Sequence, residues 1–253
     1  DHGSDPASMR TRARKDGDDW VLNGSKMWIT NGSIADVAVV WANAGEENGG
    51  IRGFVVPTDT PGFAAHKITH KMSLRASVTS ELTFENLRLP ADAVFPDVTG
   101  LKGPLACLSE ARYGIVWGAL GAARSSLDAA RRYSMERIQF GRPIAGFQLT
   151  QAKLANMATE LQLGQLLALH LGRRKDTVGL RPEQVSVGKY NNITKAIEIC
   201  RTARTILGAN GVSGEYPVLR HANNLESVLT YEGTVEMHTL VIGQALTGES
   251  AFR

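Results

Sequence analysis

The apolar residues follow two different repeats along the chain. Up to about residue 97, short runs rich in β-branched and aromatic residues are separated by turn residues about every 8–12 positions. These runs are residues 20–22, 26–30, 37–41 and 53–57, and the turns are Asn23-Gly24, Asn31-Gly32, Asn48-Gly49-Gly50 and Pro61-Gly62. Residues 77–89 alternate, with Val78, Leu82 and Phe84 on one face. Asn-Gly between such runs is typical of hairpins, so the pattern predicts a barrel or sandwich of short strands.

From about residue 101 onward, apolar residues recur at steps of three and four, which is the repeat of packed helices. Two such seams are Leu154, Met157, Leu161, Gly164, Ala168 and Leu171, and then Ile193, Ala196, Cys200, Ala203 and Leu207. We expect a first helix over about 104–136, a last helix over about 235–247, and links at 172–182 and 208–217. The predicted fold class is α+β, with a β-barrel-like domain over residues 1–97 and a bundle of four or five long helices over residues 98–253.

Composition narrows the classes of protein further. Of the 253 residues 43% are hydrophobic and 21% charged, which argues against disorder. The 28 Lys+Arg and 25 Asp+Glu give a net charge of only +3, which argues against a nucleic-acid-binding face. The two cysteines form no disulfide framework, so we expect an intracellular protein. The six histidines show no metal-ligand spacing, and no apolar run predicts a membrane span. Because the chain opens at Asp1 inside a polar loop, we expect a fragment that holds a ligand poorly alone.

The segment Tyr231-Glu232-Gly233-Thr234 lies between two expected helices. One interpretation is structural: Thr234 caps the last helix, Gly233 frees the backbone for a turn, and Glu232 favours the helix dipole. The other is chemical: Glu232 is a base at the mouth of the bundle, provided that its surroundings exclude water and raise its pKa. The spacing alone leaves both interpretations open.

Other candidate residues each have a structural interpretation, which is the more usual one, and a binding interpretation. Trp28, Ile29 and Thr30 lie on an expected strand, where a tryptophan packs in a core or forms a wall against a planar ring. Arg137 and Phe140 follow the first helix, where they suit a helix end or hold a phosphate and stack a purine. Residues 208–211 form either a helix end or a backbone approach to a pyrophosphate. The absence of GxGxxG after a strand and of a Walker A motif disfavours Rossmann and P-loop sites.

An ordered set of segments resembles the acyl-CoA dehydrogenase family, and within it the glutaryl-CoA branch of lysine and tryptophan degradation. The segments are DHGSDP (1–6), LNGSKMWITN (22–31), SLRAS (73–77), EARYGIVWGALGA (110–122), RIQFGRPIAGFQL (137–149), ILGANG (206–211) and RHANNLESVLTYEGT (220–234). The family fold has an N-terminal helical domain, a middle β domain and a C-terminal four-helix bundle. The two predicted domains correspond to the second and third, and the first is expected to be missing.

The resemblance implies FAD as cofactor and an acyl-CoA as substrate. By resemblance, the residues that contact FAD would be Ser4, Trp28, Ile29, Thr30, Arg137, Phe140, Gln148, Thr205, Ile206, Leu207, Gly208, Ala209, Thr234 and Phe252. Thr205 stands where several members carry Gln. Those that contact the acyl-CoA would be Ser4, Leu105, Leu108, Ser109, Arg112, Tyr231 and Gly233. No metal is expected.

The resemblance also implies a reaction in which Glu232 removes the α-proton of the thioester while a hydride leaves the β-carbon. In the family, the thioester oxygen accepts hydrogen bonds from the backbone N–H of the base and from a flavin hydroxyl. With glutaryl-CoA, loss of CO2 would give crotonyl-CoA, and the cation for the distal carboxylate would lie in the missing part. Family members are homotetramers that pass electrons to an electron-transferring flavoprotein, and a bacterial cytoplasm is preferred over a mitochondrial matrix.

Three other functions remain open. The first is a dehydrogenase for another short or branched acyl-CoA, which keeps every motif and lacks decarboxylation. The second is a DNA-binding protein of the same fold, which the mild charge disfavours. The third is a flavin hydroxylase of similar fold, which the intact Tyr-Glu-Gly-Thr segment disfavours.

Overall fold

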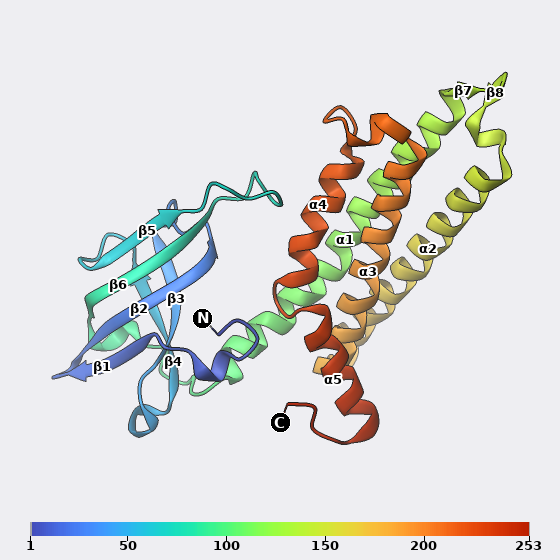
Figure 1. The fold of residues 1–253 in the computed structure, drawn as a ribbon. Helices are drawn as coiled ribbons and strands as arrows, with labels where there is room; N and C mark the ends of the chain where they lie inside the picture. The colour runs from blue at the N-terminus through green and yellow to red at the C-terminus, as the bar shows by residue number, and fades with distance from the viewer. Residues whose placement is uncertain (1, 253) are drawn as a thin grey trace. The chain divides into compact units, whose positions relative to one another are not determined.

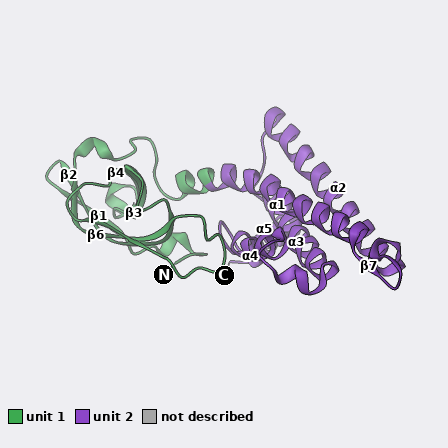
Figure 2. Cartoon of the chain, turned by 90° about the horizontal axis from the view of Figure 1, so that it is seen from above, with its two compact units in different colours: residues 1–107 green, residues 108–253 purple. Residues whose placement is uncertain are grey.

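The structure is a computed structural model that describes residues 2–252, so that Asp1 and Arg253 lie outside it. The chain divides into two compact units, Asp1–Cys107 and Leu108–Arg253 (Figure 2). The first unit holds a six-stranded sheet and the second is helical, which confirms the α+β class. Among the described residues, no helix is both long and apolar enough to cross a membrane.

The first unit is built on one sheet with strand order β4-β3-β1-β2-β6-β5 (Figure 1). Its strands are β1 (Arg12–Asp16), β2 (Asp19–Thr30), β3 (Val37–Asn43), β4 (Ile51–Pro57), β5 (Phe63–Lys67) and β6 (Thr79–Leu89). Three short 3-10 helices accompany them: Pro6–Ser8, Glu46–Asn48 and Ala91–Ala93. Every pairing is antiparallel except that of β1 with β3. Fully buried side chains such as Leu22, Phe54 and Leu87 form the core of this unit.

The expected turn at Asn23-Gly24 is wrong, because both residues lie inside the continuous strand β2. The pairing of β2 with β6 shifts register between Leu22 and Gly24, and Gly24 has a φ of 138°. A Cβ at Gly24 would stand 2.8 Å from the Cα of Thr11. The glycine therefore permits a close approach of two strands at a bulge and does not reverse the chain.

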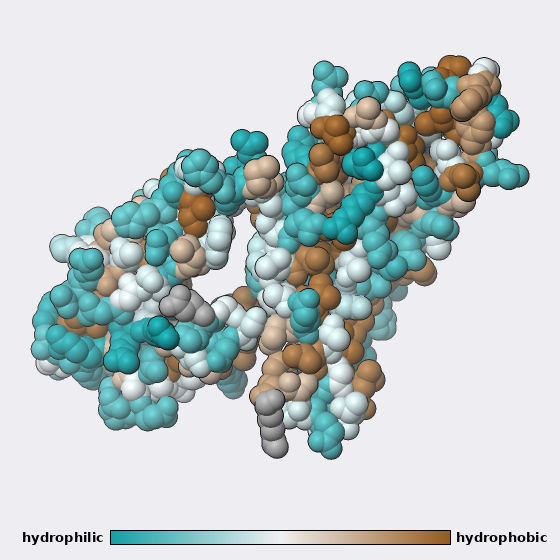
Figure 3. All heavy atoms as spheres, in the orientation of Figure 1, coloured by the Kyte–Doolittle hydropathy of each residue, from teal (hydrophilic) through white to brown (hydrophobic). Residues whose placement is uncertain are grey.

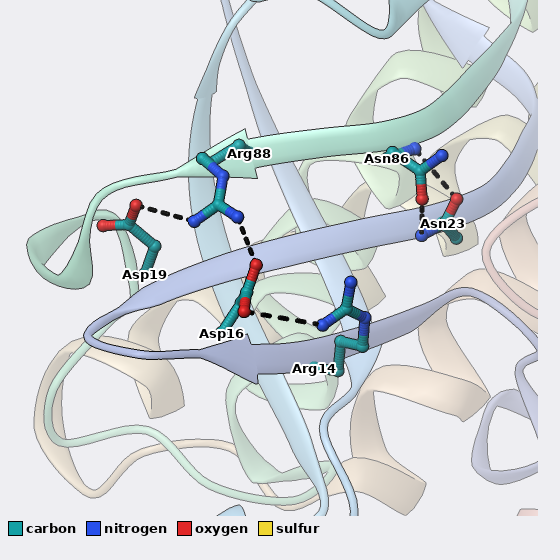
Figure 4. Close-up of polar contacts among 6 residues, drawn as sticks. All are labelled: Arg14, Asp16, Asp19, Asn23, Asn86 and Arg88. Carbon is teal, nitrogen blue, oxygen red and sulfur yellow. Dashed lines mark hydrogen bonds and ion pairs between the residues drawn. The ribbon is translucent and has the colours of Figure 1, made fainter.

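Polar side chains tie β1 and β2 to β6 at the surface (Figure 4). The Asn23 side chain accepts a hydrogen bond from the Asn86 backbone N–H at 2.9 Å, and its Nδ2 donates to Asn86 Oδ1 at 3.2 Å. Arg88 pairs with Asp19 at 2.9 Å and also with Asp16. These exposed pairs fix the strand register more than they add stability.

The second unit consists of long helices that share one core. They are α1 (Lys102–Glu136, beginning in the first unit), α2 (Gln148–Thr177), α3 (Pro182–Ile206), α4 (Pro217–Thr230) and α5 (Val235–Thr247). A small hairpin of β7 (Ile138–Gln139) and β8 (Arg142–Pro143) precedes α2, with 3-10 turns at Ile144–Gly146 and Gly208–Val212. Both predicted seams are confirmed: all their residues are buried except Leu154, which packs against the core.

The link expected from Gly172 to Pro182 is wrong at its start, because α2 continues to Thr177. A Cβ at Gly172 would meet the Tyr113 hydroxyl of α1. Gly172 therefore gives room for the Tyr113 ring, and helical context overrides its low propensity. A buried amide joins three helices nearby, since Asn192 donates to the carbonyls of Gly164 at 3.0 Å and Val116 at 3.3 Å.

Candidate active site

A strained turn joins α4 to α5. The backbone N–H of Tyr231 bonds the carbonyl of Ser227 at 2.8 Å, which closes α4, and the Thr234 hydroxyl accepts from the Met237 N–H at 3.3 Å, which caps α5. Between them Glu232 has a φ of 55° and Gly233 a φ of 98°. A left-handed conformation is costly for a glutamate, so surrounding structure must hold the turn in place.

Two cationic side chains hold the three carbonyls of this turn. Arg112 on α1 donates from Nε to the carbonyl of Glu232 at 2.6 Å. Lys189 on α3 donates from Nζ to the carbonyls of Tyr231 and Gly233, each at 2.7 Å. The Lys189 side chain is fully buried, with 1% of its surface exposed. Arg112 on α1 and Lys189 on α3 thus hold the left-handed turn in place. Their hydrogen bonds are charge-assisted and therefore stronger than hydrogen bonds between neutral groups.

The His238 ring lies against Gly233 of this turn. It is buried on α5, and its Nδ1 lies 3.0 Å from the Ser186 hydroxyl on α3. Its Nε2 has no hydrogen-bond partner within residues 2–252 and would stand 2.9 Å from a Cβ at Gly233. Burial lowers the pKa of His238 to about 4, and the nearby Lys189 and Arg112 charges add to that shift. The ring is therefore neutral at physiological pH and adds no third cation to the site.

The surroundings of Glu232 shift the pKa of its carboxyl upward. Burial raises its pKa, and the attraction of Lys189 and Arg112 opposes this without reversing it. Its Oε2 has no hydrogen-bond partner in the part of the chain that the structure describes. A carboxylate that is partly withdrawn from water and not neutralised by a direct ion pair is suited to accept a proton.

The two glutamates of this segment, Glu232 and Glu236, differ in the direction of their pKa shifts. Glu236 lies in the first turn of α5, and hydrogen bonds from Thr234 and from its own backbone lower its pKa. That is the behaviour of a carboxylate at a helix N-terminus. The pKa of Glu232 is shifted in the opposite direction. Thr234 and Glu236 therefore cap the helix, while the contacts of Glu232 are different in kind.

Four predicted residues, Arg112, Tyr231, Glu232 and Gly233, are brought together at this turn. Leu108 and Ser109 lie one turn before Arg112 on α1. By their spacing of four and three residues from Arg112, they share its helix face. Leu105 lies on the same helix with 41% of its surface exposed.

A separate group of predicted residues lies on the sheet of the first unit. Trp28 has a φ of 64° and 64% of its surface exposed, at an irregularity in the pairing of β2 with β6. Ile29 and Thr30 follow it at the end of the strand, and Ser4 is exposed before β1. A strained backbone that presents a large aromatic ring to solvent is typical of a surface that binds a flat ligand.

The β7–β8 hairpin presents a second exposed aromatic residue. Phe140 has a φ of 52° and 94% of its surface exposed, and hydrophobic side chains are visible at this tip in Figure 3. Its ring packs edge-on against Phe147, with centroids 6.0 Å apart, and Arg142 stacks on Phe147 at 4.3 Å. Arg137 and Gln148 flank the hairpin and are both exposed. The tip offers cations and an aromatic face to an anionic, aromatic ligand.

Residues 205–209 include both buried and exposed side chains. Ile206 and Leu207 are buried in the helical core, so that only their backbone is available to a ligand. Gly208, with a φ of 58°, and Ala209 are exposed in the following 3-10 turn. The Thr205 hydroxyl donates to the Arg201 carbonyl at 3.0 Å. Phe252, near the end of the described residues, has 49% of its surface exposed.

Comparison with known proteins identifies the family of the chain. The family model of the acyl-CoA dehydrogenase middle domain matches residues 1–87, and that of the acyl-CoA dehydrogenase C-terminal domain matches residues 99–247. The chain belongs to the acyl-CoA dehydrogenase family. The human mitochondrial short-chain specific acyl-CoA dehydrogenase is 38% identical over 244 residues, which are 95% of this chain and 59% of the relative.

Two solved structures of acyl-CoA dehydrogenases resemble the chain even more strongly. Glutaryl-CoA dehydrogenase from Mycobacterium smegmatis has a TM-score of 0.97 and 69% identity over 100% of this chain and 65% of its own. A glutaryl-CoA dehydrogenase from the same organism, in complex with FADH2, has a TM-score of 0.97 and 64% identity over 99% of this chain and 64% of its own. The chain therefore spans about two thirds of these acyl-CoA dehydrogenases.

Sequence reasoning missed Lys189, His238 and Ser186. A signal for Lys189 was present, because it lies four residues before Ile193 and so extends the buried seam of α3 back to a charged residue. A lysine at a core position of a helix is rare unless it is paired. The spacing does not identify its acceptors, because they are the main-chain carbonyls of Tyr231 and Gly233, 42 and 44 residues further along the chain.

Proposed function

We propose that the chain carries the catalytic base and part of the cofactor site of an FAD-dependent dehydrogenase that converts glutaryl-CoA to crotonyl-CoA and CO2. The observation that carries this proposal is Glu232: it lies on a strained turn, its pKa is raised, and its Oε2 has no partner within residues 2–252. The 69% identity to a glutaryl-CoA dehydrogenase supports the choice of substrate.

The exposed aromatic surfaces fit FAD as the cofactor. Trp28, with Ile29 and Thr30, would flank the flavin ring, and Phe140, with Arg137 and Gln148, would hold the ADP part of an FAD bound by a neighbouring subunit. Trp28 and Phe140 both have a left-handed backbone and an exposed side chain. A residue that only packs in a core does not need this costly backbone conformation. When bound, FAD supplies the acceptor for the hydride from the substrate β-carbon.

Residues of this chain handle the proton. Glu232 removes it from the α-carbon, and its backbone N–H is free to donate to the thioester oxygen, because this N–H has no backbone acceptor within residues 2–252. Burial helps by raising the pKa of the carboxylate towards the working pH. After CO2 leaves a glutaryl substrate, the protonated Glu232 would return its proton to give crotonyl-CoA.

A dehydrogenase for a short acyl-CoA without decarboxylation is the second candidate. The 38% identity to a short-chain specific acyl-CoA dehydrogenase supports it. The same Glu232 chemistry serves both, and only the fate of the distal carboxylate differs. Electrons would pass to an electron-transferring flavoprotein from a homotetramer in either case.

The test compares Glu232→Gln with Glu236→Gln in the complete gene product. We expect Glu232→Gln to abolish deuterium exchange at the α-carbon of glutaryl-CoA while FAD absorbance and melting temperature are retained. Glu236→Gln removes a nearby carboxylate of the helix cap and should keep exchange. Crotonyl-CoA and CO2 from the wild type with an electron acceptor establish the substrate, and turnover of butyryl-CoA alone favours the second candidate. Wild-type exchange in Glu232→Gln contradicts the role of Glu232.

A further inference from the structure

Lys189 is a buried cation whose hydrogen bonds all go to the main chain. Its ammonium donates to the carbonyls of Tyr231 and Gly233 and forms no ion pair within residues 2–252. Withdrawing an ammonium from water is costly, and burial lowers the pKa of Lys189 to about 8. A neutral amide could also donate to these two carbonyls without the cost of burying a charge, so the charge itself requires an explanation.

The covalent connection of the turn supplies one. The carbonyl of Tyr231 and the N–H of Glu232 belong to the same planar peptide group. A cation bonded to the carbonyl oxygen withdraws electron density from that group and makes its N–H a stronger donor, because linked hydrogen bonds polarise one another in a low-dielectric interior. Lys189 bonds this carbonyl at 2.7 Å, and the Glu232 N–H on its other side is left without a backbone acceptor within residues 2–252.

We propose that Lys189 is a positioning residue that acts through the Tyr231–Glu232 peptide: it fixes the left-handed turn and strengthens the Glu232 N–H as the donor to the substrate's thioester oxygen. This inference rests on the proposed function, since it needs a thioester at Glu232. Arg112 holds the Glu232 carbonyl, which belongs to the next peptide group, so it shares the positioning role but not the polarisation of this N–H.

The groups that face Lys189 define what else can titrate near it. They are Arg112 from α1, Tyr231 and Glu232 from the turn, and His238 from α5. The Arg112 charge favours the neutral amine and the Glu232 charge opposes it. Burial raises the pKa of Tyr231 and lowers that of His238 to about 4, so neither changes charge between pH 7 and about 9.

The experiment measures the thioester carbonyl directly in a protein that cannot turn over. In the complete gene product carrying Glu232→Gln, with FAD bound, glutaryl-CoA labelled with ¹³C at its thioester carbonyl is bound, and its infrared stretch is compared with that of the free ligand. Lys189→Met, Lys189→Gln and Lys189→Arg are then added. Lys195→Met is the control, because Lys195 lies on the same helix and pairs at the surface with Glu198 at 3.1 Å.

We expect the bound stretch to lie below the free value, and Lys189→Met to recover about 10–30% of that shift. Lys189→Gln should behave like Lys189→Met, whereas Lys189→Arg and Lys195→Met retain the shift. With Glu232 intact, Lys189→Met should lower kcat and kcat/KM equally, by about 10- to 100-fold, as for a weakened transition-state donor. Raising the pH from about 6 to about 9 should move the stretch towards the free value when Lys189 is present, and not in Lys189→Met, because deprotonation removes the cation.

Two outcomes overturn the inference and leave the proposed function intact. One is a shifted stretch that is the same with Lys189→Met as with Lys195→Met. The other, which needs no variant at position 189 to fold, is a shifted stretch that stays constant from about pH 6 to about 9, since loss of the Glu232 charge lowers the pKa of Lys189 further. An unshifted carbonyl in the Glu232→Gln protein, or a wild type that exchanges no α-proton, refutes the proposed function itself.

Discussion

Gly233→Ala tests whether the turn is held by the contacts described above. Gly233 has a φ of 98°, and a Cβ there would stand 2.9 Å from Nε2 and 3.1 Å from Cε1 of His238. The His238 ring cannot retreat freely, because it is buried and its Nδ1 lies 3.0 Å from the Ser186 hydroxyl. An alanine at this position is therefore strained in its backbone and crowded in its side chain.

Both effects can be given a magnitude. A non-glycine residue held in a sparsely populated backbone region costs about 1–3 kcal/mol. Forcing an extra methyl against a packed ring costs about 1–3 kcal/mol more. We expect the free energy of unfolding of the helical unit to fall by about 2–6 kcal/mol, which lowers Tm by roughly 4–24 °C in a chain of this size.

Two glycines provide matched controls for the strain and for the crowding. Gly179, between α2 and α3, has a φ of 78° and nothing within 4 Å of its Cβ position, so Gly179→Ala reports backbone strain alone. Gly243, inside α5, has an open Cβ position, and Gly243→Ala should stabilise the helix by about 0.5–1 kcal/mol. Urea unfolding followed by helical circular dichroism measures all three.

A Gly233→Ala chain that is destabilised no more than Gly179→Ala would show that the added methyl does not crowd the His238 ring. A double-mutant cycle with His238→Ala gives a second check. If the alanine methyl meets the ring, removing the ring should offset part of the loss, with a coupling of at least about 0.5 kcal/mol. Additive losses would show that the crowding is absent, whatever the cost of the backbone.

Three further outcomes follow from buried groups. The pKa of His238 is lowered from 6.5 to about 4, so between these pH values the unfolded chain binds more protons than the folded chain. The free energy of unfolding should therefore fall by up to about 3 kcal/mol as the pH drops from 6.5 to about 4. His238→Gln should remove this pH-dependent part of the free energy. Cys107 is exposed, whereas Cys200 is buried with its pKa raised to about 11, so a thiol reagent should label one cysteine in the native chain and two after denaturation. Asn192→Ala removes hydrogen bonds to α1 and α2 and should cost about 2–4 kcal/mol in urea unfolding.

The helices were predictable because their signal is periodic and local. The seam from Ile193 to Leu207 fixes one face of α3, and the last helix was expected over the same residues, 235–247, that the structure assigns to it. Glycines were the main source of error. Gly24 and Gly172 have the appearance of breaks, yet each makes room for a partner that is distant in sequence, Thr11 and Tyr113 respectively. Such contacts depend on tertiary packing, which turn propensities do not encode.

The candidate site was only partly accessible to the same reasoning. The resemblance placed Glu232, Tyr231, Gly233 and Arg112 in one site, and the structure brings these four together. It did not indicate what holds them, because the acceptors are backbone carbonyls, and a carbonyl carries no sequence signal. Lys189 was detectable only as a charge out of place in an apolar seam, an anomaly of the kind that tends to mark functional positions.

The acceptors that Arg112 and Lys189 use explain how the proposed base, Glu232, keeps a raised pKa beside two cations. An arginine or lysine bonded directly to the Glu232 carboxylate would lower its pKa and remove its basicity at neutral pH. Here both cations donate to main-chain oxygens, and Oε2 is left without a partner within residues 2–252. Desolvation then outweighs the remaining attraction, and the pKa rises. The charged donors thus make the turn rigid without forming a salt bridge to the Glu232 carboxylate. A direct ion pair would also make the turn rigid, but it would lower the pKa of that carboxylate.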